Sequence, residues 1–141
     1  MSSEKKLSQN TLVIDASGGI LGRIASHAAK QALLGKNVII VNCKHVLITG
    51  RRSTAIREYN AIRRRGGSSL KGPFFPKNPE RIVKRTVRGM LNYQQQRGLD
   101  AFKRVMCYNE VPLELANISK IKLVRQITAQ TTDLEDLSKE I

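Results

Sequence analysis

Short apolar runs and one helical repeat alternate over the first forty residues. Residues 11–16 (TLVIDA) and 37–42 (NVIIVN) are continuous apolar runs with the length of a buried strand. Between them, apolar residues recur at helical spacing over 20–32, and Gly35 follows where a C-terminal cap is expected. This order predicts a strand–helix–strand unit with parallel strands and a right-handed crossover.

The later elements are predicted from shorter patterns. Two more apolar runs predict strands at 45–49 and 106–111, and helical spacing predicts helices at 53–65 and 97–105. Between these helices, 66–79 holds so many Gly, Ser and Pro residues that it predicts an irregular loop.

The two ends of the chain show patterns of their own. Residues 1–10 are polar and predict a mobile leader. At the other end, Thr131 or Thr132 is expected to cap a terminal helix with acidic residues in its first turn.

Together these elements predict one α/β domain over 11–141, a three-layer α/β/α fold with a small, mostly parallel four-stranded sheet. Residues 51–78 form a basic insertion that we expect to leave the body as a loop or arm.

The helix expected at 79–91 separates its charged and apolar residues most clearly. Pro79 occupies a favourable first-turn position. At 100° per residue, four cations share an arc of about 100°: Arg81, Lys84, Arg85 and Arg88. The apolar residues take the opposite side: Ile82, Val83, Val87, Met90 and Leu91. Solvated helix faces usually mix charges of both signs, so a face that carries only cations indicates phosphate contact.

The charge of the chain indicates what kind of partner it binds. The chain has a formal net charge of +14 and a pI near 10.4. Residues 51–104 hold 15 Lys and Arg against three acids, whereas 126–141 is mildly acidic. Such an excess of positive charge repels itself unless a polyanion neutralises it, and nucleic acid is the commonest one. No apolar run approaches the roughly 18–20 residues of a membrane span, and no secretory signal is visible. A cytoplasmic protein is expected.

Arginine dominates the predicted contacts because its planar fork of donors matches phosphate geometry. Glycines beside Arg51 and Arg65 allow the backbone to approach or bend around RNA. The candidate RNA-binding residues are Arg51, Arg52, Arg57, Arg63, Arg64, Arg65, Lys71, Lys77, Arg81, Lys84, Arg85, Arg88 and Arg97.

Phe74 and Phe75 lie between two prolines and two lysines. Exposed rings among cations could stack on unpaired bases, or one ring could anchor the loop in the core. The sequence does not say which ring has which role. With six aromatic residues and no Trp, an extended platform for single strands is not expected.

The sequence offers little for catalysis, cofactors or metals. SGGILG at 17–22 resembles a dinucleotide-binding turn in position, but Ser17 replaces the first glycine and Asn42 the ribose-binding acid. We therefore expect these glycines to serve close strand-to-helix packing. No paired carboxylates or nucleophile–base pattern suggests an enzyme, and Cys43 and Cys107 have no metal-ligand spacing. No cofactor, small-molecule substrate or disulfide is expected.

Several strings resemble a known family. GGILGRIAS, the following LLGK and VLITG resemble the first half of the universal large-subunit ribosomal protein "L-thirteen" family. KGPFFPKNPERI, then RTVRGML and RG, resemble the middle of its archaeal and eukaryotic branches. The similarity spans about 12–112, and chain length and loop type resemble the archaeal branch.

The resemblance implies a Rossmann-like α/β/α fold without a nucleotide. It also implies a structural place in the large subunit beside other ribosomal proteins, with binding of large-subunit ribosomal RNA. By position, the family's RNA-facing residues would include Arg51, Arg52, Arg81, Arg85, Arg88 and Arg97. The chain departs from the family at 92–96, where NYQQQ replaces a Pro and basic residues, so contacts are not carried over there.

Two other classes of function are compatible with parts of the sequence. One is a nucleotide-binding α/β enzyme, which Ser17, Asn42 and the charge disfavour. The other is a regulatory or chromatin-type protein that binds duplex DNA, which the charge alone would also permit.

Overall fold

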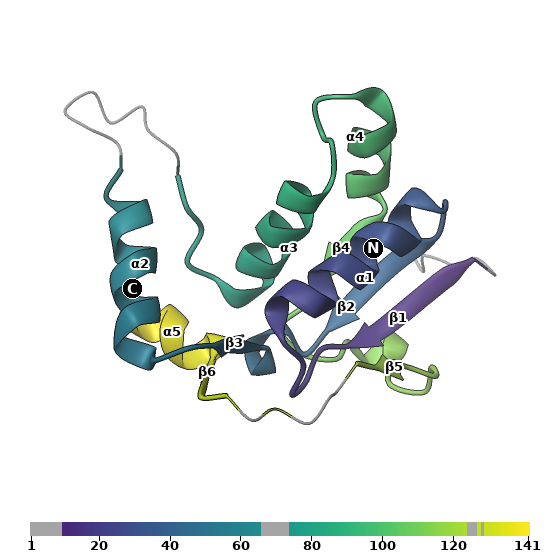
Figure 1. The fold of residues 1–141 in the computed structure, drawn as a ribbon. Helices are drawn as coiled ribbons and strands as arrows, with labels where there is room; N and C mark the ends of the chain where they lie inside the picture. The colour runs from purple at the N-terminus through teal and green to yellow at the C-terminus, as the bar shows by residue number, and fades with distance from the viewer. Residues whose placement is uncertain (1–9, 66–73, 124–126, 128) are drawn as a thin grey trace.

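A four-stranded parallel sheet forms the centre of the molecule (Figure 1). The computed structural model describes residues 10–65, 74–123, 127 and 129–141. The strands are β1 (Thr11–Asp15), β2 (Asn37–Val41), β4 (Val105–Cys107) and β5 (Ile121–Lys122), in the order β4-β2-β1-β5. β1 and β2 run in register from Thr11 opposite Asn37 to Asp15 opposite Val41, which confirms the predicted parallel unit.

Three of the α-helices that contribute to the main core pack against one face of the sheet. They are α1 (Leu21–Leu33), α3 (Pro79–Met90) and α4 (Gln96–Lys103). Ile14 and Ile40 of the sheet are fully buried in one cluster with Ile24 of α1 and Val83 of α3. α1 ends as expected, since Gly35 has a φ of +94° and donates its N–H to the Ala32 carbonyl.

The alternate sheet residues point to the other face, where a shorter element covers them. Val13 and Val41 pack against Leu115 of the 3₁₀ helix η2 (Leu113–Leu115). The β4-to-β5 connection carries η2 back past β2 and β1, because β5 lies on the far side of β1. The predicted three-layer α/β fold with a four-stranded parallel sheet is thereby confirmed, with η2 and its flanking segments as the third layer.

The third apolar run does not join this sheet. Its strand, β3 (Leu47–Thr49), follows a 3₁₀ turn, η1 (Cys43–His45), and pairs antiparallel with β6 (Thr131–Asp133) in a separate two-stranded sheet. The fourth strand of the main sheet is instead β5, a strand of two exposed residues that the sequence analysis missed. The predicted cap at Thr131 or Thr132 is wrong, because both residues lie in β6 and Asp133 is the N-cap of α5 (Leu134–Glu140).

The basic middle of the chain contains α2 (Arg52–Arg63), which stands apart from α3 and contacts α5 near its base (Figure 1). Its anchor is Ala55, which is buried in the main core. The expected leader at 1–10 lies outside the described residues except for Asn10, and 66–73 of the insertion lies outside them too. In the described part of the chain, no helix combines the length and the apolar character needed to cross a membrane.

Candidate nucleic-acid interface

Helix α3 carries the predicted basic face and is held by its apolar side. Pro79 starts the helix. The backbone N–H of Glu80, which cannot be satisfied within the first turn, donates to the Asn109 side chain at 3.0 Å. This bond compensates for the lack of a side-chain cap at Asn78. Ile82, Val83 and Val87 are fully buried against the sheet and α1. The helix therefore cannot rotate without exposing its core side, and the orientation of its cations is determined by packing.

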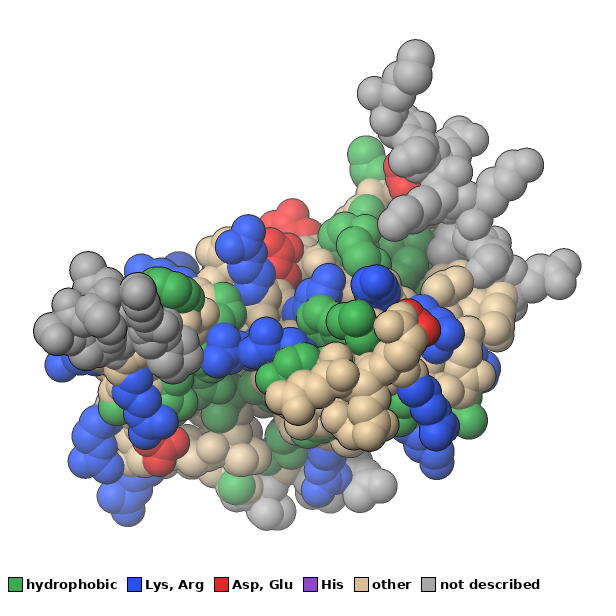
Figure 2. Space-filling model, turned by 90° about the horizontal axis from the view of Figure 1, so that it is seen from above, with side chains coloured by type: hydrophobic (Ala, Val, Ile, Leu, Met, Phe, Trp, Pro, Cys, Tyr) green, Lys and Arg blue, Asp and Glu red, His purple; other side chains and the backbone are tan. Residues whose placement is uncertain are grey.

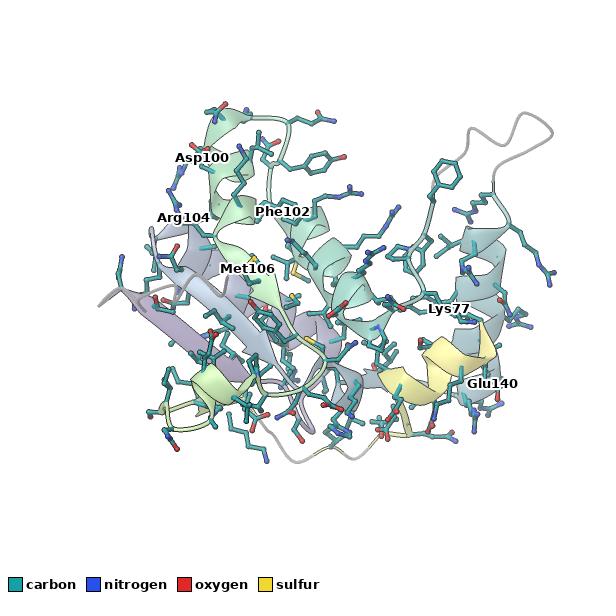
Figure 3. All side chains as sticks on the ribbon, turned by 180° about the vertical axis from the view of Figure 1, so that it is seen from behind. Lys77, Asp100, Phe102, Arg104, Met106 and Glu140 are labelled. Atoms are coloured by element: carbon teal, nitrogen blue, oxygen red, sulfur yellow. The ribbon has the colours of Figure 1, made fainter. Side chains whose placement is uncertain are left out.

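Three cations of this face each lie over an aromatic ring. The Lys84 ammonium is 5.2 Å from the ring centre of Phe102, which lies on the α3 side of α4 (Figure 3). The Arg85 guanidinium is 5.0 Å from the ring centre of Phe75, and that of Arg88 is 5.1 Å from Tyr93. Cation–π contacts of this kind contribute roughly 0.5–1 kcal/mol at exposed sites. These contacts hold the long side chains in place without neutralising their charge.

The charge of this face is not neutralised by acids among the residues that the structure describes. The ion pairs there join Lys44 to Glu110, Arg52 to Glu140, and Lys139 to Glu135. None of these pairs includes a cation of α3. Seen from above, Lys and Arg side chains cross the middle of the molecule beside exposed apolar groups (Figure 2). The face thus presents several oriented, unpaired cations to solvent, which suits a polyanion.

The other candidate residues lie on several elements around α3. Arg57 projects from α2, Arg63 ends it, and Arg64 and Arg65 follow it, all four exposed. Arg51 is the exposed N-cap of α2, Lys77 is exposed before α3, and Arg97 is exposed at the start of α4. Arg52 is bound to Glu140 at 3.1 Å, so part of its charge is already offset. Lys71 lies outside the described residues.

The roles of the two neighbouring phenylalanines are distinct. Phe75 turns inward: its ring meets Tyr59 of α2 edge-on, with the ring centres 5.2 Å apart. Phe74 turns outward with 80% of its surface exposed, while its carbonyl accepts a hydrogen bond from the Arg85 guanidinium at 3.4 Å. The anchoring alternative therefore applies to Phe75.

The sequence analysis missed the aromatic partners Tyr59, Tyr93 and Phe102. Phe102 comes from a different helix than Lys84, and Tyr59 on α2 contacts the ring of Phe75, which is distant from it in the sequence. A single indication was available for Tyr93, which follows Arg88 by five residues, just past the end of α3.

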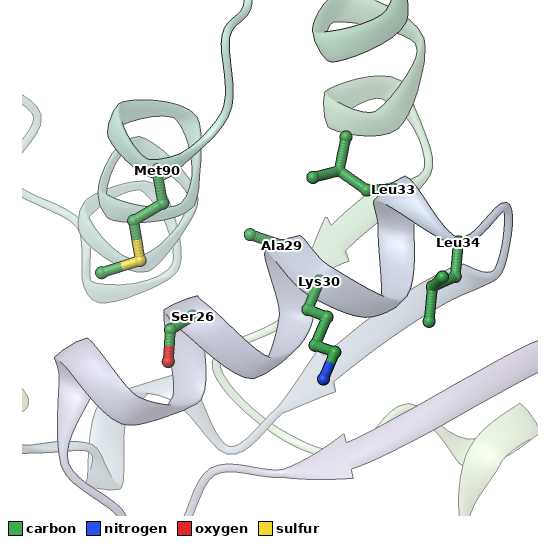
Figure 4. Close-up of a pocket in the computed structure, with 6 residues that line it drawn as sticks. All are labelled: Ser26, Ala29, Lys30, Leu33, Leu34 and Met90. Carbon is green, nitrogen blue, oxygen red and sulfur yellow. The ribbon is translucent and has the colours of Figure 1, made fainter.

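Met90 is not on the core side of α3 as predicted. It is 44% exposed and lies beside a shallow apolar groove between α1 and α3, opposite Ser26 and Leu33 (Figure 4). The prediction failed because α3 ends at Met90, and the core contact passes to Leu91, which is 4% exposed.

The loop after β1, where related folds bind nucleotides, is used for packing here. A Cβ added to Gly19 would lie 2.6 Å from the Ile24 side chain and 3.2 Å from the Leu123 carbonyl oxygen. The Asp15 carboxylate accepts hydrogen bonds from the Ser17 backbone and the Asn42 side chain, both at 3.0 Å. The contact at Gly19 supports the expected role in strand-to-helix packing, whereas a Cβ added to Gly22 would have open space.

The two cysteines, 64 positions apart in sequence, are neighbours in the fold. Both are free thiols. The hydrogen bond with Cys107 and burial both raise the pKa of the Cys43 thiol, which disfavours its thiolate form. In the parts of the chain that the structure describes, no three His, Cys, Asp or Glu side chains are grouped as metal ligands.

Comparison with known proteins identifies the family. The family model for ribosomal protein L13 matches residues 9–114. The large ribosomal subunit protein uL13 of Methanosarcina barkeri is 49% identical over 112 residues, which are 79% of each chain. That of Methanococcoides burtonii is 40% identical over 134 residues, covering 92% of this chain and 96% of the relative. That of Methanocaldococcus jannaschii is 41% identical over 132 residues. These three relatives are archaeal, and the chain belongs to the ribosomal protein L13 family.

Proposed function

We propose that this protein is a structural constituent of the large ribosomal subunit, not an enzyme, and that it binds large-subunit ribosomal RNA. Its partners in that setting are the RNA and neighbouring large-subunit proteins, and its binding supports assembly of the subunit. Two lines of support meet here. The relatives are named as large ribosomal subunit proteins, and the charge of +14 favours a polyanionic partner that relieves its self-repulsion.

The observation that carries the RNA proposal is the unpaired basic face of α3. Arg85 and Arg88 lie on aromatic rings, and Arg85 uses one donor, Nη1, on the Phe74 carbonyl. The ring contacts leave the other N–H donors of the two guanidinium groups for phosphate oxygens. Arg81 is exposed one turn before Arg85 on the same side. Cations already held in place lose little side-chain freedom on binding, so each phosphate contact retains more of its favourable free energy.

The basic insertion 51–78 extends this surface in the proposal. Further phosphate contacts come from four exposed residues on α2 and directly after it: Arg57, Arg63, Arg64 and Arg65. We propose that the insertion works as an arm, whose neutralisation by RNA relieves the repulsion among its own cations.

Salt dependence tests the proposal directly. Filter binding to a transcript of the large-subunit ribosomal RNA of Methanosarcina barkeri should show log affinity falling with log salt, with roughly 0.7–0.9 per phosphate contact. The double variant Arg81→Gln, Arg88→Gln should reduce that slope by up to two contacts. The matched control, Lys36→Gln with Lys122→Gln, removes the same charge from β5 and from the turn before β2, away from α3 (Figure 1).

The outcomes separate the alternatives. Equal effects of the two double variants would mean that net charge, and not the α3 face, decides affinity. A slope near zero would contradict electrostatic binding altogether. Tighter binding to duplex DNA than to the ribosomal RNA at equal salt would support the DNA-binding alternative. Unfolding of the α3 variant, with unchanged affinity per folded molecule, would make the basic face a structural feature.

A further inference from the structure

We propose that Phe74 is a stacking site for one unpaired base of the bound RNA. This inference rests on the proposed RNA binding and adds a contact that only an unpaired base can make. The starting observation is the exposure of the ring: 80% of the Phe74 surface meets solvent. A phenylalanine is normally among the most buried residues, so such a ring is available to a partner.

The structure holds this exposed ring in a defined place. The next residue, Phe75, is wedged between Tyr59 of α2 and the Arg85 guanidinium, with ring and cation centres 5.2 Å and 5.0 Å away. The same guanidinium donates from Nη1 to the Phe74 carbonyl. The backbone that carries Phe74 is therefore tied to α2 and to α3, and its ring projects from a supported segment.

The surroundings favour a nucleotide over an apolar protein pocket. Arg85, which holds the Phe74 backbone, belongs to the basic face, and Lys77 is exposed three residues further along. A phosphate bound by this face would place its own base within reach of the Phe74 ring. Cations beside an aromatic platform are the usual arrangement for unpaired nucleotides, because the cation binds the backbone while the ring binds the base.

The base must be unpaired for geometric reasons. In an A-form duplex the bases are already stacked on each other, and the deep, narrow major groove does not admit a side chain. A single ring can therefore contact only a base in a loop, a bulge or an end. One stacked base changes affinity by about five- to a hundred-fold when the ring is removed.

Because the chain has no tryptophan, Phe74→Trp gives a single fluorescent reporter at the site. Adding the Methanosarcina barkeri large-subunit RNA transcript should quench its emission, and a blunt 20-base-pair RNA duplex should not. Leu113→Trp is the matched control, since Leu113 is 94% exposed but lies in η2 on the opposite face of the sheet. Its emission should not respond to either RNA.

Affinity measurements separate stacking from charge. Phe74→Ala and Phe74→Leu should both weaken binding to the transcript about five- to a hundred-fold, and Phe74→Tyr should retain it. The salt slope should stay at the wild-type value in all three, because no charge is lost. The proposal is overturned if Phe74→Leu binds like the wild type, or if the Phe74→Trp emission is unchanged while filter binding shows a complex. That second outcome would assign the ring to a protein neighbour. If wild-type protein fails to bind the transcript, the proposed function itself fails.

Discussion

Gly89 gives a prediction in which protein stability and RNA affinity move in opposite directions. It lies inside α3 next to Arg88 and one turn after Arg85, on the exposed side. Glycine is unfavourable in a helix by about 0.8–1.0 kcal/mol relative to alanine. Apart from its neighbours in the chain and the backbone of its own helix, a Cβ added at Gly89 would have open space, so close packing does not explain the glycine.

Gly89→Ala should therefore stabilise the free protein. We expect about 0.5–1 kcal/mol, because α3 ends one residue later at Met90 and the last turn of a helix frays. For a chain of this size, that gain raises Tm by roughly 2–4 °C. If RNA packs closely on this face, the added methyl group would clash with the RNA. Overfilling costs about 1–3 kcal/mol, so affinity should fall roughly fivefold or more.

Gly22→Ala is the matched control. A Cβ there also has open space, but Gly22 lies in the first turn of α1. It should give a smaller gain in stability and no change in RNA affinity. Urea unfolding measures the first quantity and filter binding the second. A destabilised Gly89→Ala would refute the helix argument, and a stabilised variant with unchanged affinity would show that RNA does not pack against this end of α3.

Three further predictions concern other parts of the structure. Gly98→Ala should destabilise the protein by about 2–3 kcal/mol in urea unfolding, because the new Cβ would lie 1.9 Å from the Asn92 carbonyl oxygen. A wild-type midpoint would contradict that close packing. Val83→Asp should unfold the domain, as seen by circular dichroism, since it places a carboxylate at a fully buried position at a cost of several kcal/mol; a folded variant would disprove the assignment of this helix side. The Lys44 ammonium lowers the pKa of Glu110, so the stabilisation from this exposed pair is present above the ordinary carboxyl pKa and is lost as pH falls through the lowered one. An NMR titration of Glu110 in wild type and in Lys44→Gln should show the lower pKa only with the lysine present.

Local patterns were sufficient for several parts of the fold. The strand–helix–strand unit at the start followed from buried apolar runs and helical spacing, because both are read from neighbouring residues. The two faces of α3 followed in the same way, since a helix places residues three and four apart on one side. Composition and charge, together with the family resemblance, indicated the class of partner, because a basic excess requires a counter-charge wherever the chain folds.

Pairing between distant segments needed the tertiary structure. β5 consists of two exposed residues, Ile121 and Lys122, that no apolar pattern distinguishes from a loop. β3 looked like a strand of the main sheet, but its partner is β6, more than eighty residues later. Strand partners are chosen by long-range packing and by the available sheet edges, which a single run of residues does not encode.

The details of the candidate interface were also decided in three dimensions. Phe74 and Phe75 are chemically identical neighbours, and only the packed fold shows that Phe75 turns inward onto Tyr59 of α2. The cations of α3 could be counted from the sequence, but the rings beneath Lys84 and Arg88 could not be assigned, because they come from α4 and from the turn before it. A side chain's charge is a property of its residue type, whereas its orientation and its neighbours are properties of the packed fold.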